Sequence, residues 1–582
     1  MLTKKFASMK NNFQPVQITR FVLSLCCLLC FSVHLFAQQI TVSGNVKDSS
    51  GEPVIGASVL VKGTTNGVIT DFDGNFSIAN VEDGSQIEVS YIGYVTQMKK
   101  ATGTQPLNFI LKEDTETLDE VIVVGSGNEK AISDYLKKFG EDLGLETIQD
   151  DTLNIIIRKP ATKGYENCPG VILQGHMDMV CEKNKDTDHN FVTDPIKLRV
   201  EYDMIYATGT TLGADNGIAV AMGMAVLASN NLEHPAIEVL ITTDEEAGMS
   251  GAMAFDGSLL KGQYIINLDS EEEGYLLVSC AGGVTALSEL NAEYTNIDSN
   301  KQPLLVEIKG LLGGHSGIDI IKQRANSNIL MGRLLNLLCI DYDLAKIQGG
   351  SKNNAIPREC EAIIVVDKND VEKTKNCINE IMNTFKHEFS TSDPGINIEC
   401  TETTVDKVFD DKTKTNVISL LNLIPNGIQT MSMDIEGLVE SSTNLGVVHT
   451  TENSVTFECA VRSSVKTLKD DITNKMDLLA TNLNGKLILD SDYPAWEYAK
   501  GSKLEKICVE TYEKLTGKKP IIMAIHAGLE CGLLLDKMPH AQAISLGPDM
   551  FEVHTPNEHL NISSTKRTWD YLVAILKGMN QY

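Results

Sequence analysis

The spacing of hydrophobic residues changes once along the chain. Residues 39–112 contain short runs of alternating or clustered β-forming residues, such as "ITVSGNV" and "IEVSYIGY", with turn residues between them. The Asp73–Gly74 pair in this stretch is a hairpin signal. The stretch contains no histidine and so offers no imidazole for acid–base or metal chemistry. We expect residues 38–112 to form a small all-β sandwich that binds or spaces rather than catalyses.

Helical spacing begins after Gly125. In "NEKAISDYLKKFGEDLGL" hydrophobic residues recur every three or four positions, and helix-like and strand-like segments alternate from there on. This alternation predicts α/β architecture with a largely parallel sheet. We interpret a second α/β region as a domain inserted into the first. The predicted organisation is a leader at 1–37, the sandwich at 38–112, a linker at 113–125, a catalytic domain at 126–282 and 496–582, and the inserted domain at 283–495.

The leader has the pattern of a secretory signal peptide. Four basic residues precede the hydrophobic run "FVLSLCCLLCFSVHLFA", and Ala37 supplies a small residue for cleavage. The run has about 17 residues, which is marginal for a membrane span. A cleaved signal is therefore favoured over an uncleaved anchor, and the leader predicts export to the periplasm or outer envelope.

Composition adds two constraints. The chain has 582 residues and a net charge of −28, and an acidic surface repels phosphate backbones, so a nucleic-acid partner is not expected. Of the 13 cysteines, three lie in the leader and ten are scattered from Cys168 to Cys531 without any CxxC spacing. Scattered cysteines of this kind are typical of a cytosolic enzyme, which conflicts with the leader.

Acidic and histidine side chains follow five hydrophobic runs of the α/β region. They are His176 and Asp178, Asp215, Glu245 and Glu246, Asp269, and His554. In open α/β sheets, sites form outside the carboxyl ends of the strands. Imidazole nitrogen and carboxylate oxygen are the ligands that a pair of zinc ions requires. We therefore predict a metal site assembled from these residues.

The residues themselves suggest roles. Positions i and i+2 of an extended segment point to the same side, so Asp178 can orient His176 as a metal ligand. Glu245 and Glu246 are neighbours that point apart, so one can bind metal while the other acts as a general base. Asp215 has two carboxylate oxygens and can bridge two metals.

Each element alone has a simpler interpretation. The HxD motif is usually a turn or a hydrogen-bonded pair, the "DEE" run is usually a solvated acidic surface, and Asp215 can be a helix N-cap. His554 alone indicates nothing. The specificity lies in the combination of all of them in one chain.

Residues 126–582 resemble the aminoacyl-histidine dipeptidase family, also called peptidase D or cytosol non-specific dipeptidase. The motifs that carry the likeness are "ILQGHMDMVCEK", "TLGADNGIAVA", "TTDEEAGMSGA", "INLDSEEEG", "GLLGGHSGIDI", "NNAIPRE", "HAGLECG" and "GPDMFEVHTPNE". The resemblance implies a di-zinc aminopeptidase-like catalytic domain with an inserted α/β lid and dimerisation domain. It also implies hydrolysis of dipeptides, both Xaa-His and others.

The same resemblance implies the metal ligands. His176 and Asp269 would hold one Zn²⁺, Glu246 and His554 would hold the other, and Asp215 would bridge them. Cobalt or manganese can replace zinc in such sites.

The resemblance also assigns the catalytic groups. Glu245 would be the general base, and Asp178 would orient the first histidine ligand. His315 would stabilise the oxyanion across a homodimer formed through the inserted domain, although by itself it can be a turn histidine.

Three further positions match substrate-binding residues of related enzymes. Asn354 and Arg462 would hold the C-terminal carboxylate of the dipeptide, and Glu530 would meet its ammonium group. Arg462 can instead be a surface ion-pair partner, and Glu530 can instead cap a helix.

The N-terminal part resembles another class of protein. "SGNVKDSSGEPVIGASVLVKGTTNGVITDFDGNFSI" and "SYIGY" are similar to the carboxypeptidase-regulatory-like domain of TonB-dependent receptors of the starch-utilisation type. "TLDEVIVVG", residues 117–125, resembles the TonB-contacting box of such receptors and implies a TonB-like contact. No array of barrel strands follows it.

The joint between the two resemblances is abrupt. The likeness to the dipeptidases begins at Ser126, without their usual first segment and without a Gly-, Ser- or Pro-rich linker. We interpret the joint as a recombination or misjoined gene rather than an evolved fusion, and expect the missing segment to lower the stability of the peptidase. Alternatives to the dipeptidase are an aminoacylase or aminopeptidase of the same clan, and a receptor-derived binding module in a non-functional or unstable chimera. Despite the cytosolic family, we expect export to prevail.

Overall fold

The computed structural model describes residues 39–112, except 50, 55, 56, 65, 72, 92, 93 and 104, and residues 129–581. The predicted leader, the linker with its TonB-box-like segment and the joint at Ser126 lie outside the described residues. The chain divides into two compact units, Met1–Glu120 and Val121–Tyr582. No helix within the described residues is both long and apolar enough to cross a membrane.

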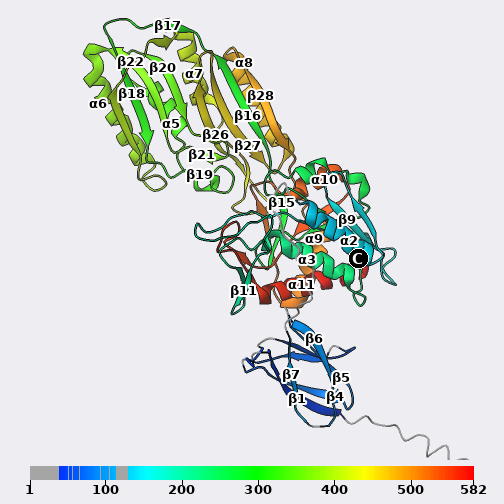
Figure 1. Ribbon diagram of the computed structural model, residues 1–582. Helices are drawn as coiled ribbons and strands as arrows, with labels where there is room; N and C mark the ends of the chain where they lie inside the picture. Colours follow the sequence, from blue (N-terminus) through cyan, green and yellow to red (C-terminus); the bar gives the residue numbers. More distant parts are fainter. Residues whose placement is uncertain are drawn as a thin grey trace, which may run out of the picture. The chain divides into compact units, whose positions relative to one another are not determined.

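The first unit is all-β, as the alternating pattern predicts (Figure 1). One sheet has the order β4-β1-β7 and the other the order β3-β2-β5-β6. Val46 and Phe109 of the first sheet share one buried core with Val59 and Ile87 of the second. The strands are β1 Gln39–Lys47, β2 Ser58–Val61, β3 Gly67–Ile69, β4 Asn75–Glu82, β5 Gln86–Tyr91, β6 Tyr94–Lys100 and β7 Leu107–Ile110.

The second unit contains an eight-stranded sheet of order β29-β15-β30-β14-β10-β13-β9-β8. The four central strands, β30, β14, β10 and β13, are parallel, and β9 and β8 continue the sheet antiparallel. The strands are β8 Glu146–Gln149, β9 Ile155–Lys159, β10 Val171–His176, β13 Ile237–Thr242, β14 Tyr264–Asn267, β15 Tyr275–Cys280, β29 Ile521–Ile525 and β30 Gln542–Ser545.

Helices cover both faces of this sheet. Alternate strand residues such as Leu173 pack with helices on one face, while Ile172 packs with Leu534 of α10 on the other. This is why the central strands are hydrophobic throughout rather than alternating. The first face carries α2 Lys130–Asp142, α3 Ala214–Ala228, α9 Lys503–Thr516 and α11 Ile562–Gly578; α10 is Glu530–Lys537 and the short α4 is Ser250–Ala254.

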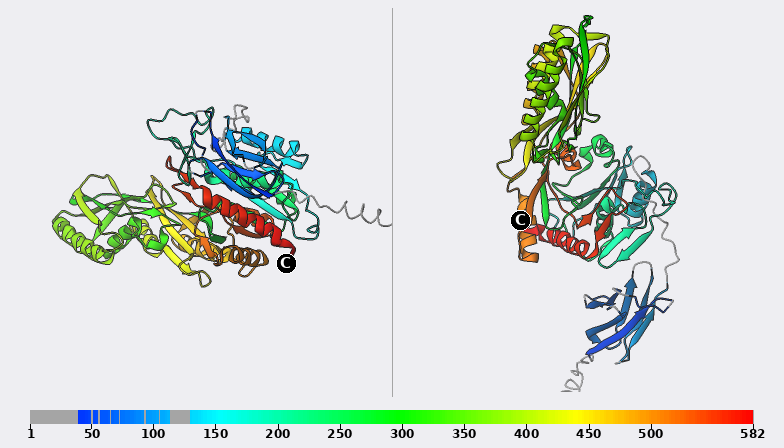
Figure 2. Two further views of the ribbon diagram at one scale, coloured as in Figure 1. Left: turned by 90° about the horizontal axis from the view of Figure 1, so that it is seen from below. Right: turned by 90° about the vertical axis from the view of Figure 1, so that its left-hand side faces the viewer.

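Residues 282–493 form a second, antiparallel sheet of order β23-β18-β22-β20-β26-β27-β16-β28, with β25 paired to β26. Its helices share one core with the sheet, and Figures 1 and 2 show them gathered beside it. The elements are β16 Gly282–Asn291, β18 Lys301–Lys309, α5 Ser327–Leu337, β20 Tyr342–Gly349, β22 Cys360–Asp367, α6 Val371–Glu388, β23 Asn397–Glu402, α7 Asp411–Leu423, β25 Gly427–Met431, β26 Val439–Thr450, β27 Ser454–Ser463, α8 Lys466–Asn482 and β28 Gly485–Tyr493.

Three small sheets complete the unit. One has the order β11-β12-β32-β31, and the other two pair β17 with β24 and β19 with β21. Their bounds are β11 Leu198–Glu201, β12 Met204–Ala207, β17 Tyr294–Asn296, β19 Gly314–His315, β21 Ala355–Ile356, β24 Lys407–Phe409, β31 Met550–Phe551 and β32 His559–Asn561.

Two chain segments connect the large sheets, and they are bonded to each other. Cys280, at the end of β15, and Trp496, after β28, exchange backbone hydrogen bonds of 3.1 Å in both directions. Ser279 Oγ also donates to the Trp496 carbonyl at 2.8 Å. The antiparallel sheet is therefore attached through a paired two-strand connection.

The approach of α3 to β10 requires a glycine. A Cβ on Gly175 would lie 2.3 Å from Asn216 Oδ1 and 2.4 Å from the Ala219 Cβ. Asn216 in turn accepts a hydrogen bond from the His176 backbone and donates to the Leu268 carbonyl. The missing side chain thus allows one asparagine to join the ends of β10 and β14.

We predict that Gly175→Ala lowers the free energy of unfolding by about 1–3 kcal/mol, because the added methyl group must displace α3. Denaturant unfolding of the full chain measures this change. Gly217→Ala is the matched control, since a Cβ there meets nothing within 4 Å. It should leave stability unchanged or raise it by up to about 1 kcal/mol. Equal effects of the two substitutions would contradict the close-packing argument.

Candidate metal centre

The first cluster of site residues forms at the carboxyl ends of β10 and β14. His176 is the last residue of β10, and Asp269 follows two residues after the end of β14. His176 Nε2 lies 3.1 Å from Asp215 Oδ1 and 3.4 Å from Asp269 Oδ1. One ligand atom from each of the three lies within 4.8 Å of the others. The three side chains are close enough to share one cation.

A second cluster uses the other oxygen of Asp215. His554 Nε2 lies 3.1 Å from Asp215 Oδ2 and 3.0 Å from Glu246 Oε1. His554 follows β31 and has a φ of 65°, a left-handed conformation that few residues other than glycine adopt. The two oxygens of one carboxylate therefore face imidazoles from positions far apart in the sequence.

The donor atoms fit bound cations. Glu246 Oε1 and Asp269 Oδ1 are buried and accept no hydrogen bond, although each lies near an imidazole nitrogen. A buried, unpartnered carboxylate oxygen is costly unless a positive charge compensates it. The neighbouring carboxylates of Asp215 and Glu246 also raise the pKa of His554 to about 10, so the cluster favours positive charge. The nitrogen and oxygen donors suit divalent metals such as zinc.

Asp178 connects the two acidic segments. Its Oδ1 and Oδ2 accept hydrogen bonds of 3.1 Å from the backbone N–H groups of Glu245 and Glu246. His176 Nδ1 lies 3.1 Å from the Asp178 backbone carbonyl and 3.4 Å from Asp178 Oδ1. Burial alone would raise the pKa of Asp178, but the bonds from His176 and the backbone outweigh burial and lower it. Asp178 therefore holds the His176 ring through its carbonyl and carboxylate, and the turn after β13 through its carboxylate alone.

Glu245 lies beside both clusters. One of its oxygens lies within 4.8 Å of ligand atoms of His176 and Glu246. Burial, together with the nearby charge of Asp269, raises the pKa of Glu245 to about 9. Glu246 pairs with His554, whereas the structure gives Glu245 no ion pair with either imidazole among the described residues. The two neighbours thus have different partners, although one oxygen of each lies within 4.8 Å of the other.

Glu558 is a site residue that the sequence interpretation missed. Its carboxylate is buried and accepts backbone hydrogen bonds from Leu212, Gly213, Ala214 and Asp215, at 2.8, 3.0, 2.8 and 3.3 Å. It therefore fixes the start of α3, whose N-cap is Gly213, so the Asp215 side chain does not act as the cap. The available signal was a glutamate four residues after His554, but only coordinates reveal its backbone partners.

A different pair is formed by His315 of β19 and Arg462 of β27. His315 Nδ1 accepts hydrogen bonds from the backbone of Gly317 and Ile318 at 3.2 and 3.1 Å. Burial and the nearby charge of Arg462 lower the pKa of His315. Arg462 Nη1 donates to the Tyr493 hydroxyl at 2.9 Å, while its Nε is buried without a partner. His315 thus lies near Arg462 and belongs to none of the three clusters of potential metal ligands.

The other two predicted substrate residues have different environments. The side chain of Asn354 is exposed, and its carbonyl accepts a 2.8 Å hydrogen bond from the Ser316 backbone. Glu530 begins α10 and is buried, and its Oε2 accepts hydrogen bonds from Gln174 at 2.6 Å and Thr242 at 2.7 Å. Burial raises the pKa of Glu530 to about 7. Its Oε1 is buried without a partner.

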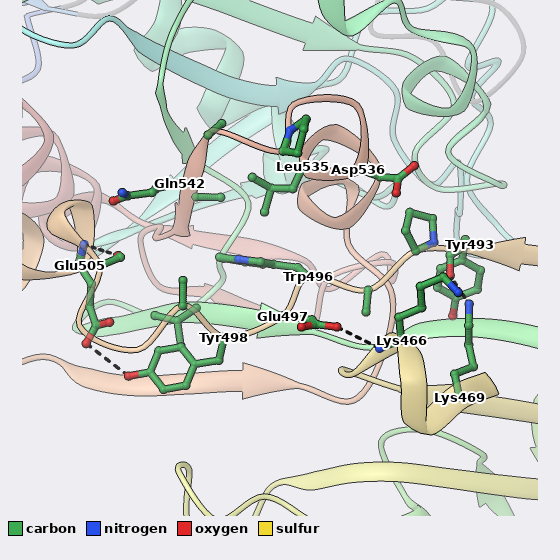
Figure 3. Close-up of a pocket in the computed structure, with 18 of the residues that line it drawn as sticks. Lys466, Lys469, Tyr493, Trp496, Glu497, Tyr498, Glu505, Leu535, Asp536 and Gln542 are labelled. Carbon is green, nitrogen blue, oxygen red and sulfur yellow. Dashed lines mark hydrogen bonds between the residues drawn. The ribbon is translucent and has the colours of Figure 1, made fainter. Parts of the chain in front are cut away.

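A pocket of about 640 Å³ lies beside the two-strand connection and contains none of the predicted site residues. Figure 3 shows Lys466 and Lys469 from α8 on one side, Trp496 in the connecting segment, and Leu535 from α10. Tyr493 also lines it and accepts the hydrogen bond from Arg462. The pocket therefore marks the connection between the sheets rather than the acidic centre.

Comparison with known proteins agrees with the geometry. Residues 172–578 match the model of peptidase family M20/M25/M40, and residues 42–123 match that of the CarboxypepD_reg-like domain. The cytosol non-specific dipeptidase of Escherichia coli is 38% identical over 78% of this chain and 94% of its own length. The solved structure of aminoacylhistidine dipeptidase from Vibrio alginolyticus is 38% identical, covering 79% of this chain and 94% of that one, with a TM-score of 0.75.

The N-terminal unit has separate relatives. The TonB-dependent receptor SusC of Bacteroides thetaiotaomicron is 51% identical over 21% of this chain, but the match spans only 11% of that receptor. The predicted resemblances of both parts are thereby confirmed. The chain belongs to peptidase family M20/M25/M40, hydrolases that act on peptide bonds, and carries a CarboxypepD_reg-like domain before its peptidase part.

Proposed function

We propose that this chain is a two-metal dipeptidase that acts on Xaa-His and other dipeptides. The observation that carries the proposal is the position of Asp215, whose two oxygens face His176 and His554 at 3.1 Å each. The 38% identity to a dipeptidase over nearly its full length supports the substrate class. In this proposal residues 126–282 and 496–582 form the catalytic domain, and residues 283–495 form a lid.

The proposed metal ligands follow the two clusters. His176 and Asp269 hold one cation, Glu246 and His554 hold the other, and Asp215 contacts both. Two Zn²⁺ ions suit this donor set, and Co²⁺ or Mn²⁺ can replace them. When bound, the metals polarise the scissile carbonyl and lower the pKa of water to about 7, which makes a nucleophile available near neutral pH.

Glu245 carries the proton in this proposal. Its carboxylate accepts a proton from the attacking water and returns it to the amine that leaves, as a general base and then a general acid. Asp178 keeps the backbone of Glu245 and the ring of His176 in place through the bonds described above. Asp178 thereby positions both the proposed base, Glu245, and a proposed metal ligand, His176.

Residues proposed to bind the two ends of the substrate limit its length to a dipeptide. The guanidinium of Arg462 and the exposed amide of Asn354 suit the C-terminal carboxylate of a dipeptide, since arginine binds carboxylates through paired N–H groups. Glu530 is proposed to meet the ammonium group at the other end. His315 is proposed to stabilise the oxyanion from the second subunit of a homodimer formed through the lid.

One prediction of the proposed function concerns the substrate and the general base Glu245. The full-length chain should hydrolyse alanyl-histidine but neither its N-acetylated form nor a tripeptide of the same residues. Glu245→Gln should lower kcat by about 10²–10⁴-fold with unchanged metal content, because it removes the proton acceptor but no ligand. Glu272→Gln, at an exposed neighbouring acid, is the control and should keep full activity. Preference for the acetylated compound would indicate an aminoacylase, and preference for the tripeptide an aminopeptidase.

Another prediction of the proposed function concerns Glu558. Its carboxylate joins the loop of His554 to the backbone that presents Asp215, so it positions the shared ligand without touching metal. Glu558→Gln should weaken metal binding by about 10–100-fold, the range for groups that orient ligands. Calorimetric titration of the metal-free protein measures this loss. Glu552→Gln, on the same loop and exposed, should bind metal normally. Unchanged affinity in Glu558→Gln would refute the positioning role.

We also propose that the leader directs the chain to the envelope, against the cytosolic location that the name of the Escherichia coli relative states. Support comes from the signal-like pattern of residues 1–37 and from the receptor-like domain that follows. Fractionation of the native host should recover the chain, shortened after Ala37, outside the cytosol. Recovery of the uncleaved chain in the cytosol alone would exclude export.

A further inference from the structure

Two cysteines of the lid lie in contact although they are 38 residues apart in the chain. Cys339 follows the end of α5 and is exposed, whereas Cys377 lies within α6 and is buried. Their sulfur atoms are 3.1 Å apart, and both are free thiols. This separation is about 1 Å more than the length of a disulfide bond. A small rotation of the side chains suffices to join them.

Helix α5, which Cys339 follows, and helix α6, which carries Cys377, are held together independently of the sulfurs. Arg333 of α5 donates two hydrogen bonds to Glu388 of α6, at 2.8 and 3.0 Å. The Arg333 guanidinium also lies over the Phe385 ring, with its central carbon 4.9 Å from the ring centroid. Paired guanidinium–carboxylate bonds are the geometrically specific kind. The two helices are therefore fixed relative to each other, and joining sulfurs that are already 3.1 Å apart requires little movement of the backbone.

The surroundings of the pair argue against a metal site. Among the described residues, no cluster of three or more potential ligands contains Cys339 or Cys377. The buried Cys377 instead packs in the hydrophobic core of the lid with residues such as Ile378 and Phe385. A structural zinc needs four ligands. Two thiols without further donors are suited to oxidation rather than to metal binding.

We propose that Cys339 and Cys377 are a site of oxidative modification, joined into a disulfide by a small-molecule disulfide such as oxidised glutathione. The exposed Cys339 thiolate attacks the oxidant and releases one glutathione as its thiol, leaving a mixed disulfide on Cys339. The Cys377 thiolate then attacks the Cys339 sulfur and releases the second glutathione. The two cysteines lose two electrons and two protons, and the oxidant takes up both as two thiols.

The bond has a defined structural consequence. It closes a loop that contains β20 and β22, and it ties the end of α5 to α6 within the lid. Closing such a loop removes conformations from the unfolded chain and so stabilises the fold. Neither cysteine belongs to the clusters around Asp215, so the bond should not alter the metal ligands. The inference is independent of the proposed function and of the substrate.

The experiment uses the full-length chain, first reduced and then incubated with oxidised glutathione. Peptide mass spectrometry should find the peptides containing Cys339 and Cys377 joined, with two hydrogens lost. Thermal unfolding of the lid should shift upward by about 5–10 °C. Cys339→Ser and Cys377→Ala should lose both effects, and Cys168→Ser, at a partly buried cysteine outside the lid, should keep both.

The outcomes separate the proposal from its alternatives. Stable glutathione on Cys339 without closure of the bond would overturn it, as would a different pairing of Cys377. An oxidised chain that unfolds at the same temperature as Cys339→Ser would also contradict the stabilising role. Comparison of the reduced forms of both variants with the reduced parent shows whether the substitutions themselves disturb the fold.

Discussion

The candidate centre depends on a single carboxylate held between two imidazoles. Asp215 reaches His176 with one oxygen and His554 with the other, across 39 and 339 positions of sequence. Such a contact is stable only if the backbone on every side is fixed. Asn216 connects α3 with β10 and β14, and Glu558 binds the four N–H groups at the start of α3. These four amide groups stabilise the buried carboxylate of Glu558.

The fold was predictable from the sequence to the extent that periodicity determines it. Alternating residues predicted the all-β unit, and the mixed helix and strand pattern predicted α/β architecture; both are confirmed. The largely parallel sheet is found only in the eight-stranded part. The sheet of residues 282–493 is antiparallel, and its helices share one core with it. Its strands alternate between buried and partly exposed residues, as β18 does, which is typical of an antiparallel sheet with one solvated face. Pattern alone did not separate these two kinds of sheet.

The candidate site was predictable where its contacts join side chains that follow strands, and less so where the partners are backbone amide groups. His176, Asp269 and Glu246 follow strands, so their meeting at one sheet edge could be inferred. Glu558 could not, because its partners are amide groups that any sequence contains. The proximity of His315 and Arg462, and that of Cys339 and Cys377, also depends on how sheet and helices pack. No motif in a single sequence encodes such contacts.

The connection between the two large sheets bears on the proposed role of residues 283–495 as a lid. Cys280 and Trp496 are bonded to each other, so the two segments form one ribbon. Tyr493, one end of that ribbon, accepts the hydrogen bond from Arg462 and lines the pocket behind it. In the proposed function, a rotation of the lid about this ribbon would change the position of Arg462 and the pocket together. The acidic centre is anchored by β10, β14 and Glu558, so the proposed substrate capture and the proposed metal binding depend on different parts of the chain.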